Sequence, residues 1–199
     1  MTYGPPSRRV LLAAAAAAAS PVSAAEIGAG HRSTRRCTMS FDRERFIDDC
    51  TTASRERESQ AAVREVLACA IRDHAAVLTA LGPPQEAGLD VLHRSPTLTV
   101  FAAKWAPQMN LVAHDHRMWA LIGIYTGRED NILWRPAADG VEAYAAKVLF
   151  AGDVAVLSED AIHSVTNPLP RFTAGIHIYG GDFFDTTRRQ WDSETLAEG

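Results

Sequence analysis

Cysteine is scarce in this chain of 199 residues, and several common sequence signatures are missing. The only cysteines are Cys37, Cys50 and Cys69, and none forms a CxxC pair, which excludes a disulfide-stapled scaffold and a zinc finger built on thiolates. No apolar run approaches the roughly 20 residues that span a bilayer. The chain also lacks a GxGxxG, P-loop or GxSxG motif and any solenoid-type repeat. We therefore expect that the protein does not partner with a membrane and does not have a nucleotide-binding fold.

An excess of basic charge is missing as well. The chain has 20 Lys and Arg residues against 24 Asp and Glu residues, a net charge of −4, so it offers no basic surface for nucleic acid. With 47% hydrophobic and 22% charged residues, the composition is that of an ordinary globular protein. The length allows one compact domain, which we expect to be a monomer or a small homo-oligomer.

The first 38 residues read as a leader that is separate from the fold. Arg8 and Arg9, the alanine run that follows and the small residues around Ala24 are typical of a secretory or twin-arginine signal peptide. Alternatively, translation starts at Met39 and the leader belongs to a start codon assigned too far upstream. A signal peptide would place the protein in the periplasm or outside the cell, and a start at Met39 would place it in the cytoplasm.

The rest of the chain changes character once. Residues 39–84 carry apolar side chains at three- and four-residue intervals, which predicts a layer of helices that starts near Ser40 and stops at Gly82. Residues 85–199 contain short runs rich in branched and aromatic side chains, separated by Pro, Gly and Asp, which predict an antiparallel sandwich or barrel. The expected strands are Leu98–Ala103, Trp119–Tyr125, Ile132–Trp134, Lys147–Phe150, Val154–Leu157, Ile162–Val165 and Thr173–Tyr179.

Histidines stand out within the predicted barrel. His114 and His116 flank Asp115, and on an extended segment alternate side chains share a face, so both imidazoles can bind one metal ion. His163 lies on a later predicted strand and can complete a set of three imidazole ligands. Imidazole suits Fe, Zn, Cu and Ni alike, so the ligands alone leave the metal open.

These residues resemble the two sequence motifs of the cupins. His114, His116 and Gly127 match the first motif, in which Ala120 replaces the usual glutamate ligand. A second motif is matched at its Gly, His and Asn positions by Gly152, His163 and Asn167, while Ser158 and Asp160 replace its Pro and Gly. The resemblance implies a mainly β fold: a single cupin, a double-stranded β-helix or jelly-roll barrel, with the N-terminal α-helical layer against it.

A metal set of three histidines without a carboxylate is similar to that of the cysteine dioxygenase and 3-mercaptopropionate dioxygenase group. That group has a Ser-x-His-x-Tyr strand whose histidine orients a tyrosine beside the iron, and this chain has Gly175, His177 and Tyr179 in its place. The resemblance implies a dioxygenase that uses Fe(II) and O₂ to convert a small thiol into a sulfinic acid. The missing serine leaves the relay to His177 shortened, and a buried Tyr–His pair satisfied by backbone groups is the competing interpretation.

Substrate binding is less well defined. A substrate carboxylate is matched best by a guanidinium group, and Arg94 and Arg117 are the candidates, with Trp119 as a wall of the pocket. Two other functions stay open: a metal-binding cupin that acts as a sensor or binding module without turnover, and a cupin hydrolase or isomerase that uses Zn, Ni or Mn.

Overall fold

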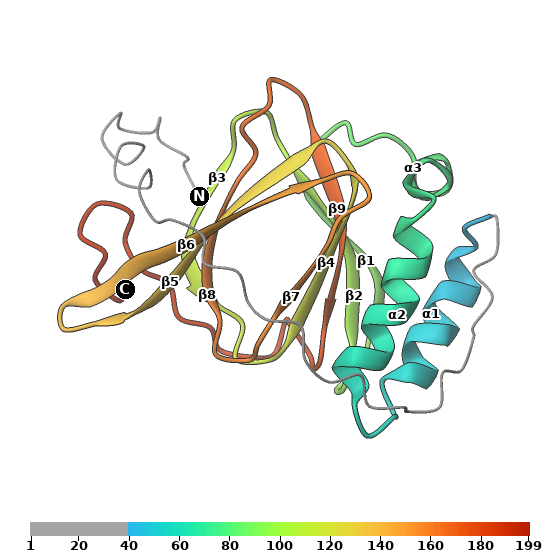
Figure 1. The fold of residues 1–199 in the computed structure, drawn as a ribbon, viewed down its shortest axis with the longest axis horizontal. Helices are drawn as coiled ribbons and strands as arrows, with labels where there is room; N and C mark the ends of the chain where they lie inside the picture. The colour runs from blue at the N-terminus through green and yellow to red at the C-terminus, as the bar shows by residue number, and fades with distance from the viewer. Residues whose placement is uncertain (1–39) are drawn as a thin grey trace, which may run out of the picture. The chain divides into compact units, whose positions relative to one another are not determined.

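A computed structural model describes residues 40–199, so the expectations for the leader and for Met39 lie outside the described residues. Three helices come first and nine strands follow (Figure 1). The helices are α1 (Arg43–Ala53), α2 (Ser59–Ile71) and α3 (His74–Leu81). The strands are β1 (Gly88–Arg94), β2 (Thr99–Trp105), β3 (Asn110–Asp115), β4 (Ala120–Thr126), β5 (Arg128–Ala137), β6 (Gly140–Phe150), β7 (Val154–Leu157), β8 (Ile162–Thr166) and β9 (Thr173–Tyr179).

Two of the helices begin at aspartate caps. The side chain of Asp42 accepts a hydrogen bond from the Arg45 backbone N–H at the start of α1, and Asp73 does the same for Ala76 at the start of α3. A side-chain oxygen at this position satisfies one of the free N–H groups of the first turn. The first helix therefore begins at Arg43 after the Asp42 cap, close to the start that the sequence predicted near Ser40.

Two antiparallel sheets face each other and form the barrel. One sheet has the strand order β1-β2-β9-β4-β7 and the other has the order β3-β8-β5-β6. Neighbours within each sheet come from distant parts of the chain: β9 lies between β2 and β4, and β8 lies between β3 and β5. This alternation of early and late strands is the jelly-roll arrangement of a double-stranded β-helix, and it confirms the predicted fold class.

The helices cover the outer face of the five-stranded sheet (Figure 1). In α2, Leu67 and Ile71 are fully buried and pack in one cluster with Leu121 and Tyr125, which lie on the helix-facing side of β4. The alternate residues of β4, such as Ile122, belong to a second cluster inside the barrel. Strand β4 is therefore buried on both faces, and its sequence is a continuous apolar run without polar alternation.

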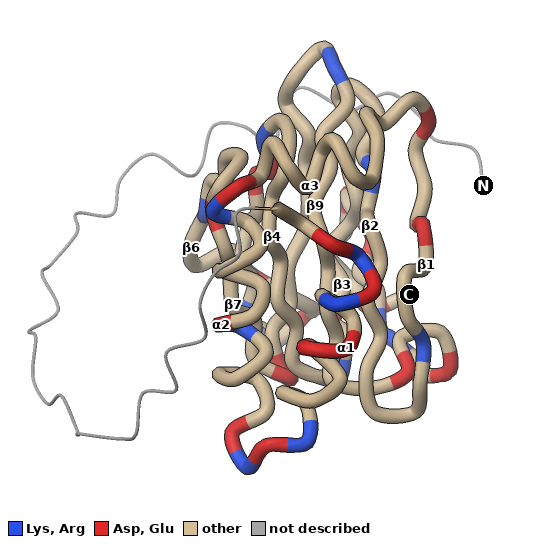
Figure 2. The backbone as a smooth tube through the Cα atoms, turned by 90° about the vertical axis from the view of Figure 1, so that its right-hand side faces the viewer, with Lys and Arg blue, Asp and Glu red and all other residues tan. Residues whose placement is uncertain are grey.

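Acidic and basic residues are interspersed along the described backbone, which shows no continuous basic stretch (Figure 2). Among residues 40–199, no helix combines the length and the apolar character that crossing a bilayer requires.

Candidate metal centre

The topology brings the three histidines together from distant parts of the chain. Strands β3 and β8 are antiparallel neighbours, and His114 is the direct cross-strand partner of His163. Side chains of directly opposed residues lie on the same face of a sheet. His116 follows the last residue of β3 and continues its alternation, so its imidazole joins the other two inside the barrel.

The three imidazole rings face one another with their Nε2 atoms. The Nε2 atom of His116 lies 3.2 Å from Nε2 of His114 and 3.4 Å from Nε2 of His163. Two nitrogens that each lie about 2.1 Å from one ion are about 3.0 Å apart at a right angle and about 3.4 Å apart at a tetrahedral angle. The spacing therefore fits three ligands around a single divalent ion.

Hydrogen bonds on the outer side of two rings determine where their protons are. His114 donates from Nδ1 to the carbonyl oxygen of Val112 at 2.9 Å, and His163 donates from Nδ1 to the amide oxygen of Asn131 at 2.7 Å. Since a neutral imidazole carries one proton, the Nε2 atoms of both residues have free lone pairs. Two free lone pairs directed at a third imidazole nitrogen are a donor set that a divalent ion can take, so the residues present fit a bound metal ion.

Burial keeps the ligands neutral in the protein without metal. It lowers the pKa of His116 to about 2, with the charges of neighbouring cationic groups adding to the effect, and it also lowers the pKa values of His114 and His163. Because neutral imidazole is the form that binds metal, the site needs no deprotonation near pH 7. Ala120, at the position of the usual glutamate ligand, adds no carboxylate.

His177 and Tyr179 lie on the facing sheet and inside the same barrel. The Nδ1 atom of His177 lies 3.3 Å from the hydroxyl oxygen of Tyr179, and the Tyr179 ring centroid lies 4.9 Å from that of His116. Both side chains are buried, at 3% exposure each. Burial and the charge of Glu129 raise the pKa of Tyr179 above its ordinary value, so its hydroxyl stays protonated.

Trp119 does not line this site. Ala120 points into the barrel, so Trp119 before it points outward and packs against the cluster between the sheet and the helices. The expectation that Trp119 walls a substrate pocket is therefore wrong, because the alternation of side chains along β4 turns its ring to the other face.

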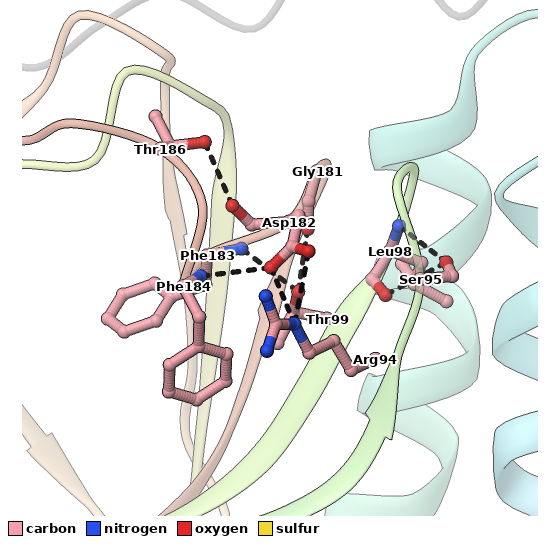
Figure 3. Close-up of polar contacts among 9 residues, drawn as sticks. All are labelled: Arg94, Ser95, Leu98, Thr99, Gly181, Asp182, Phe183, Phe184 and Thr186. Carbon is pink, nitrogen blue, oxygen red and sulfur yellow. Dashed lines mark hydrogen bonds and ion pairs between the residues drawn. The ribbon is translucent and has the colours of Figure 1, made fainter.

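The two predicted arginine anchors are both exposed. Arg94 is already paired: its Nε lies 2.9 Å from the carboxylate of Asp182, and its guanidinium stacks over the ring of Phe184 (Figure 3). Arg117 lies in the turn between β3 and β4 with a left-handed backbone (φ 54°).

A third arginine, Arg188, carries no sequence motif and is exposed as well, and it contacts a ring beside the site. The guanidinium carbon of Arg188 lies 3.9 Å from the ring centroid of Phe183, and that ring lies 4.5 Å from the ring of Tyr179. The charge of Arg188 also contributes to the lowered pKa values of His114 and His116. No motif marks Arg188, since it comes from an irregular segment after β9.

The turn that carries this segment is held at the edge of the barrel. Thr99 donates to the carbonyl oxygen of Gly181 at 2.7 Å and accepts from the N–H of Phe183 (Figure 3). Phe183 is thereby pressed against the ring of Phe101, with the centroids 5.0 Å apart. Two open hollows on the described surface, one beside Trp191 and one beside Tyr125, contain none of the site residues.

No family model matches the chain. Among solved structures, it is similar to a protein with a double-stranded β-helix domain from Klebsiella pneumoniae, with 13% identity over 57% of this chain and 87% of the other, at a TM-score of 0.44. A cupin family protein from Methanocaldococcus jannaschii has 8% identity over 51% and 85%, at a TM-score of 0.43. An oxalate decarboxylase from Bacillus subtilis has 13% identity over 48% and 24%, at 0.41.

The strand order itself defines a jelly-roll barrel of the double-stranded β-helix type, and inside it lies a buried cluster of three histidines that could hold a metal ion.

Proposed function

We propose that the protein is an iron(II)-dependent dioxygenase that converts a small thiol, such as cysteine or 3-mercaptopropionate, into its sulfinic acid. Both atoms of O₂ enter the product, so RSH and O₂ give RSO₂H without a further reductant. The observation that carries the proposal is the combination of three neutral imidazoles, with no carboxylate in their cluster among residues 40–199, and a buried Tyr–His pair against them.

Neutral ligands explain the choice of a thiol. Three imidazoles leave the full double charge on a divalent ion, whereas a carboxylate would neutralise part of it. A thiol close to such a charge loses its proton more readily, because the thiolate is stabilised. Iron(II) held by His114, His116 and His163 would supply the positive charge that favours a thiolate and the redox chemistry that O₂ requires. The preference for iron over Zn, Ni or Mn comes from the resemblance to thiol dioxygenases.

The remaining side chains hold the substrate and exclude water. Tyr179 keeps its hydroxyl proton, and its contact with Nδ1 of His177 fixes the direction of that hydroxyl beside His116. Arg188 offers a guanidinium at the edge of the barrel, where it can pair with the carboxylate of a mercapto acid. Phe183, at 7% exposure, covers the rings beneath it.

Oxygen uptake tests the proposal directly. Protein purified without air is loaded with Fe(II), and O₂ consumption is followed after addition of cysteine, 3-mercaptopropionate or cysteamine. We expect uptake with at least one of these thiols, and a sulfinic acid that carries two ¹⁸O atoms when ¹⁸O₂ is supplied.

Three controls accompany this experiment: protein loaded with another metal, the His163→Ala variant, and free Fe(II) without protein. Protein loaded with Zn, Ni or Mn should consume no O₂, and His163→Ala should lose both iron and activity. If the iron-loaded protein oxidises none of the three thiols faster than free iron does, the proposal is wrong. The metal-binding sensor, or the hydrolase or isomerase that uses another metal, then takes its place.

A further inference from the structure

Glu129 is a fully buried carboxylate that does not belong to the histidine cluster. It lies on β5, and its two oxygens are held by different donors: Trp105 donates from Nε1 to Oε2 at 2.7 Å, and Asn131 donates from Nδ2 to Oε1 at 3.0 Å. Burial alone would raise the pKa of Glu129, but the neighbouring His177 and these hydrogen bonds hold that pKa below its usual value. The group is therefore ionised and can only accept hydrogen bonds.

Through Asn131, this carboxylate reaches a metal ligand. Because Glu129 only accepts, the NH₂ group of Asn131 must face it, and the amide oxygen of Asn131 then faces the other way. That oxygen lies 2.7 Å from Nδ1 of His163. An amide oxygen also only accepts, so the proton of His163 is held on Nδ1 and its Nε2 stays free toward the cluster.

The same carboxylate lies beside the histidine of the Tyr–His pair. Nε2 of His177 has no hydrogen-bond partner among the described residues, and Oε2 of Glu129 lies 3.6 Å from it, at the long end of an ion-pair contact. A proton on Nε2 leaves Nδ1 of His177 as the acceptor of the Tyr179 hydroxyl proton. The shortened relay expected from the sequence is thus replaced by one that ends on Glu129.

Gly175 shows that Glu129 approaches from a different strand than the missing serine would. A Cβ atom on Gly175 would lie 3.5 Å from Nε2 of His177, so a serine on β9 would reach this nitrogen. The same Cβ would lie only 3.0 Å from Cδ1 of Ile124, which closes that space. Glu129 reaches the same nitrogen from β5 on the opposite sheet.

We infer that Glu129 is a positioning residue that fixes the protons of two histidines at once: through Asn131 it keeps Nε2 of His163 free for the metal, and directly it holds the proton of His177 on the side away from Tyr179. The first half, the role of Glu129 toward His163, requires only that the histidine cluster binds a metal. The second half rests on the proposed function, since it assigns the direction of the Tyr179 hydroxyl.

Glu129→Gln tests the first half without any assay of activity. Glutamine offers one oxygen and one NH₂ group, so if Trp105 keeps the oxygen, the NH₂ faces Asn131 and forces its amide to turn. His163 would then meet an N–H donor, and its proton would move to Nε2. We expect the affinity of the metal-free protein for Co²⁺ or Zn²⁺, measured against a coloured chelator, to fall about 10–100-fold.

Glu142→Gln is the matched control. It removes the same charge from the neighbouring strand β6, where the Glu142 side chain is 54% exposed and pairs with Arg135. This variant should keep the wild-type metal affinity. If folded Glu129→Gln also keeps it, the inference is wrong.

A measurement on the wild-type chain avoids any question of whether a variant folds. Nitrogen NMR of metal-free protein labelled with ¹⁵N-histidine reports which ring nitrogen carries a proton. We expect protons on Nδ1 of His163 and on Nε2 of His177. An unprotonated Nδ1 at His163 or an unprotonated Nε2 at His177 would overturn the inference. Both readouts are independent of thiol oxidation, so a failure of the proposed function and a failure of this inference can be told apart.

Discussion

Four buried imidazoles, one phenol and one carboxylate lie inside the barrel, and hydrogen bonds to neighbouring groups determine the state of the metal-site histidines. Val112 and Asn131 take the outer protons of His114 and His163, so the nitrogens of these two histidines that face the cluster are free. Their neutral state comes from burial, which costs a charged imidazole its hydration.

The role of Arg188 can be tested at this scale by Arg188→Gln. A charge-assisted hydrogen bond to a carboxylate contributes about 1.5–3 kcal/mol, so KM for 3-mercaptopropionate should rise about 10–100-fold. KM for cysteamine, which has no carboxylate, should change little. Arg117→Gln, in the exposed turn, is the control and should behave like wild type with both thiols. Equal effects of Arg188→Gln on the two thiols would remove Arg188 as the carboxylate anchor.

Sequence spacing was enough to propose His114, His116 and His163, because an HxH pair and a histidine in a second motif are visible without coordinates. Glu129 and Arg188 carry no such mark. Glu129 is an acidic residue two positions before Asn131 on a strand, which would have suggested a shared face, but its contact with His177 crosses between sheets. A contact between two sheets depends on how the sheets face each other, which the spacing of residues along the sequence does not reveal.

Helix α2 packs tightly against the barrel at Gly123 of strand β4. A Cβ atom on Gly123 would lie 2.7 Å from Cγ1 of Ile71 and 2.9 Å from Cδ1 of Leu67. The absence of a side chain on β4 at this point therefore lets the helix pack directly on the sheet. The helical layer is part of the support of the strand that faces His177.

Gly123→Ala should consequently destabilise the protein. Overpacking of a tight contact costs about 1–3 kcal/mol, so the free energy of unfolding in urea should fall by about that amount. In the double variant Gly123→Ala/Ile71→Ala, the added methyl group occupies space that Ile71 vacates, and the combined loss should be smaller than the sum of the two single losses. If the losses of the two single variants simply add, helix α2 moves to accommodate the new methyl group without strain.

Element prediction succeeded where patterns were strong. Val154–Leu157 and Thr173–Tyr179 coincide with β7 and β9, and the helical region was recognised, although it is divided into three helices. Strand β1 was missed because it is a largely exposed edge strand that starts at Gly88 and contains Asp90, so neither burial nor propensity marks it. Strand β6 was predicted too short, since its first half is largely exposed and rich in alanine.

For the whole molecule, the buried histidines couple stability to pH. Their pKa values are lowered in the folded protein, so below about 6.5, the ordinary value for histidine, the unfolded chain binds protons that the folded chain does not. Stability is therefore fully present above that pH and is lost as the pH falls below it. Each such histidine contributes about 1.4 kcal/mol per pH unit.

Urea unfolding of the metal-free protein, in the presence of a chelator, checks this at pH 7.5 and 5.5. We expect the free energy of unfolding to drop by a few kcal/mol, up to about 4 kcal/mol for three histidines across one full pH unit below 6.5. Addition of a saturating divalent metal should raise stability at both pH values, because the ion binds only the folded chain. Equal stability of the metal-free protein at the two pH values would contradict the burial of neutral ligands.

His114, His116 and His163 together should hold one divalent ion inside the barrel. Titration of the metal-free protein with Co²⁺, followed by the visible spectrum of the bound ion, measures this binding. We expect one ion per chain in the wild type and loss of that binding in a His163→Ala variant whose circular dichroism shows that it is folded. A wild-type chain that binds no ion, or a folded His163→Ala variant that binds it equally well, would show that these three histidines are not a metal site.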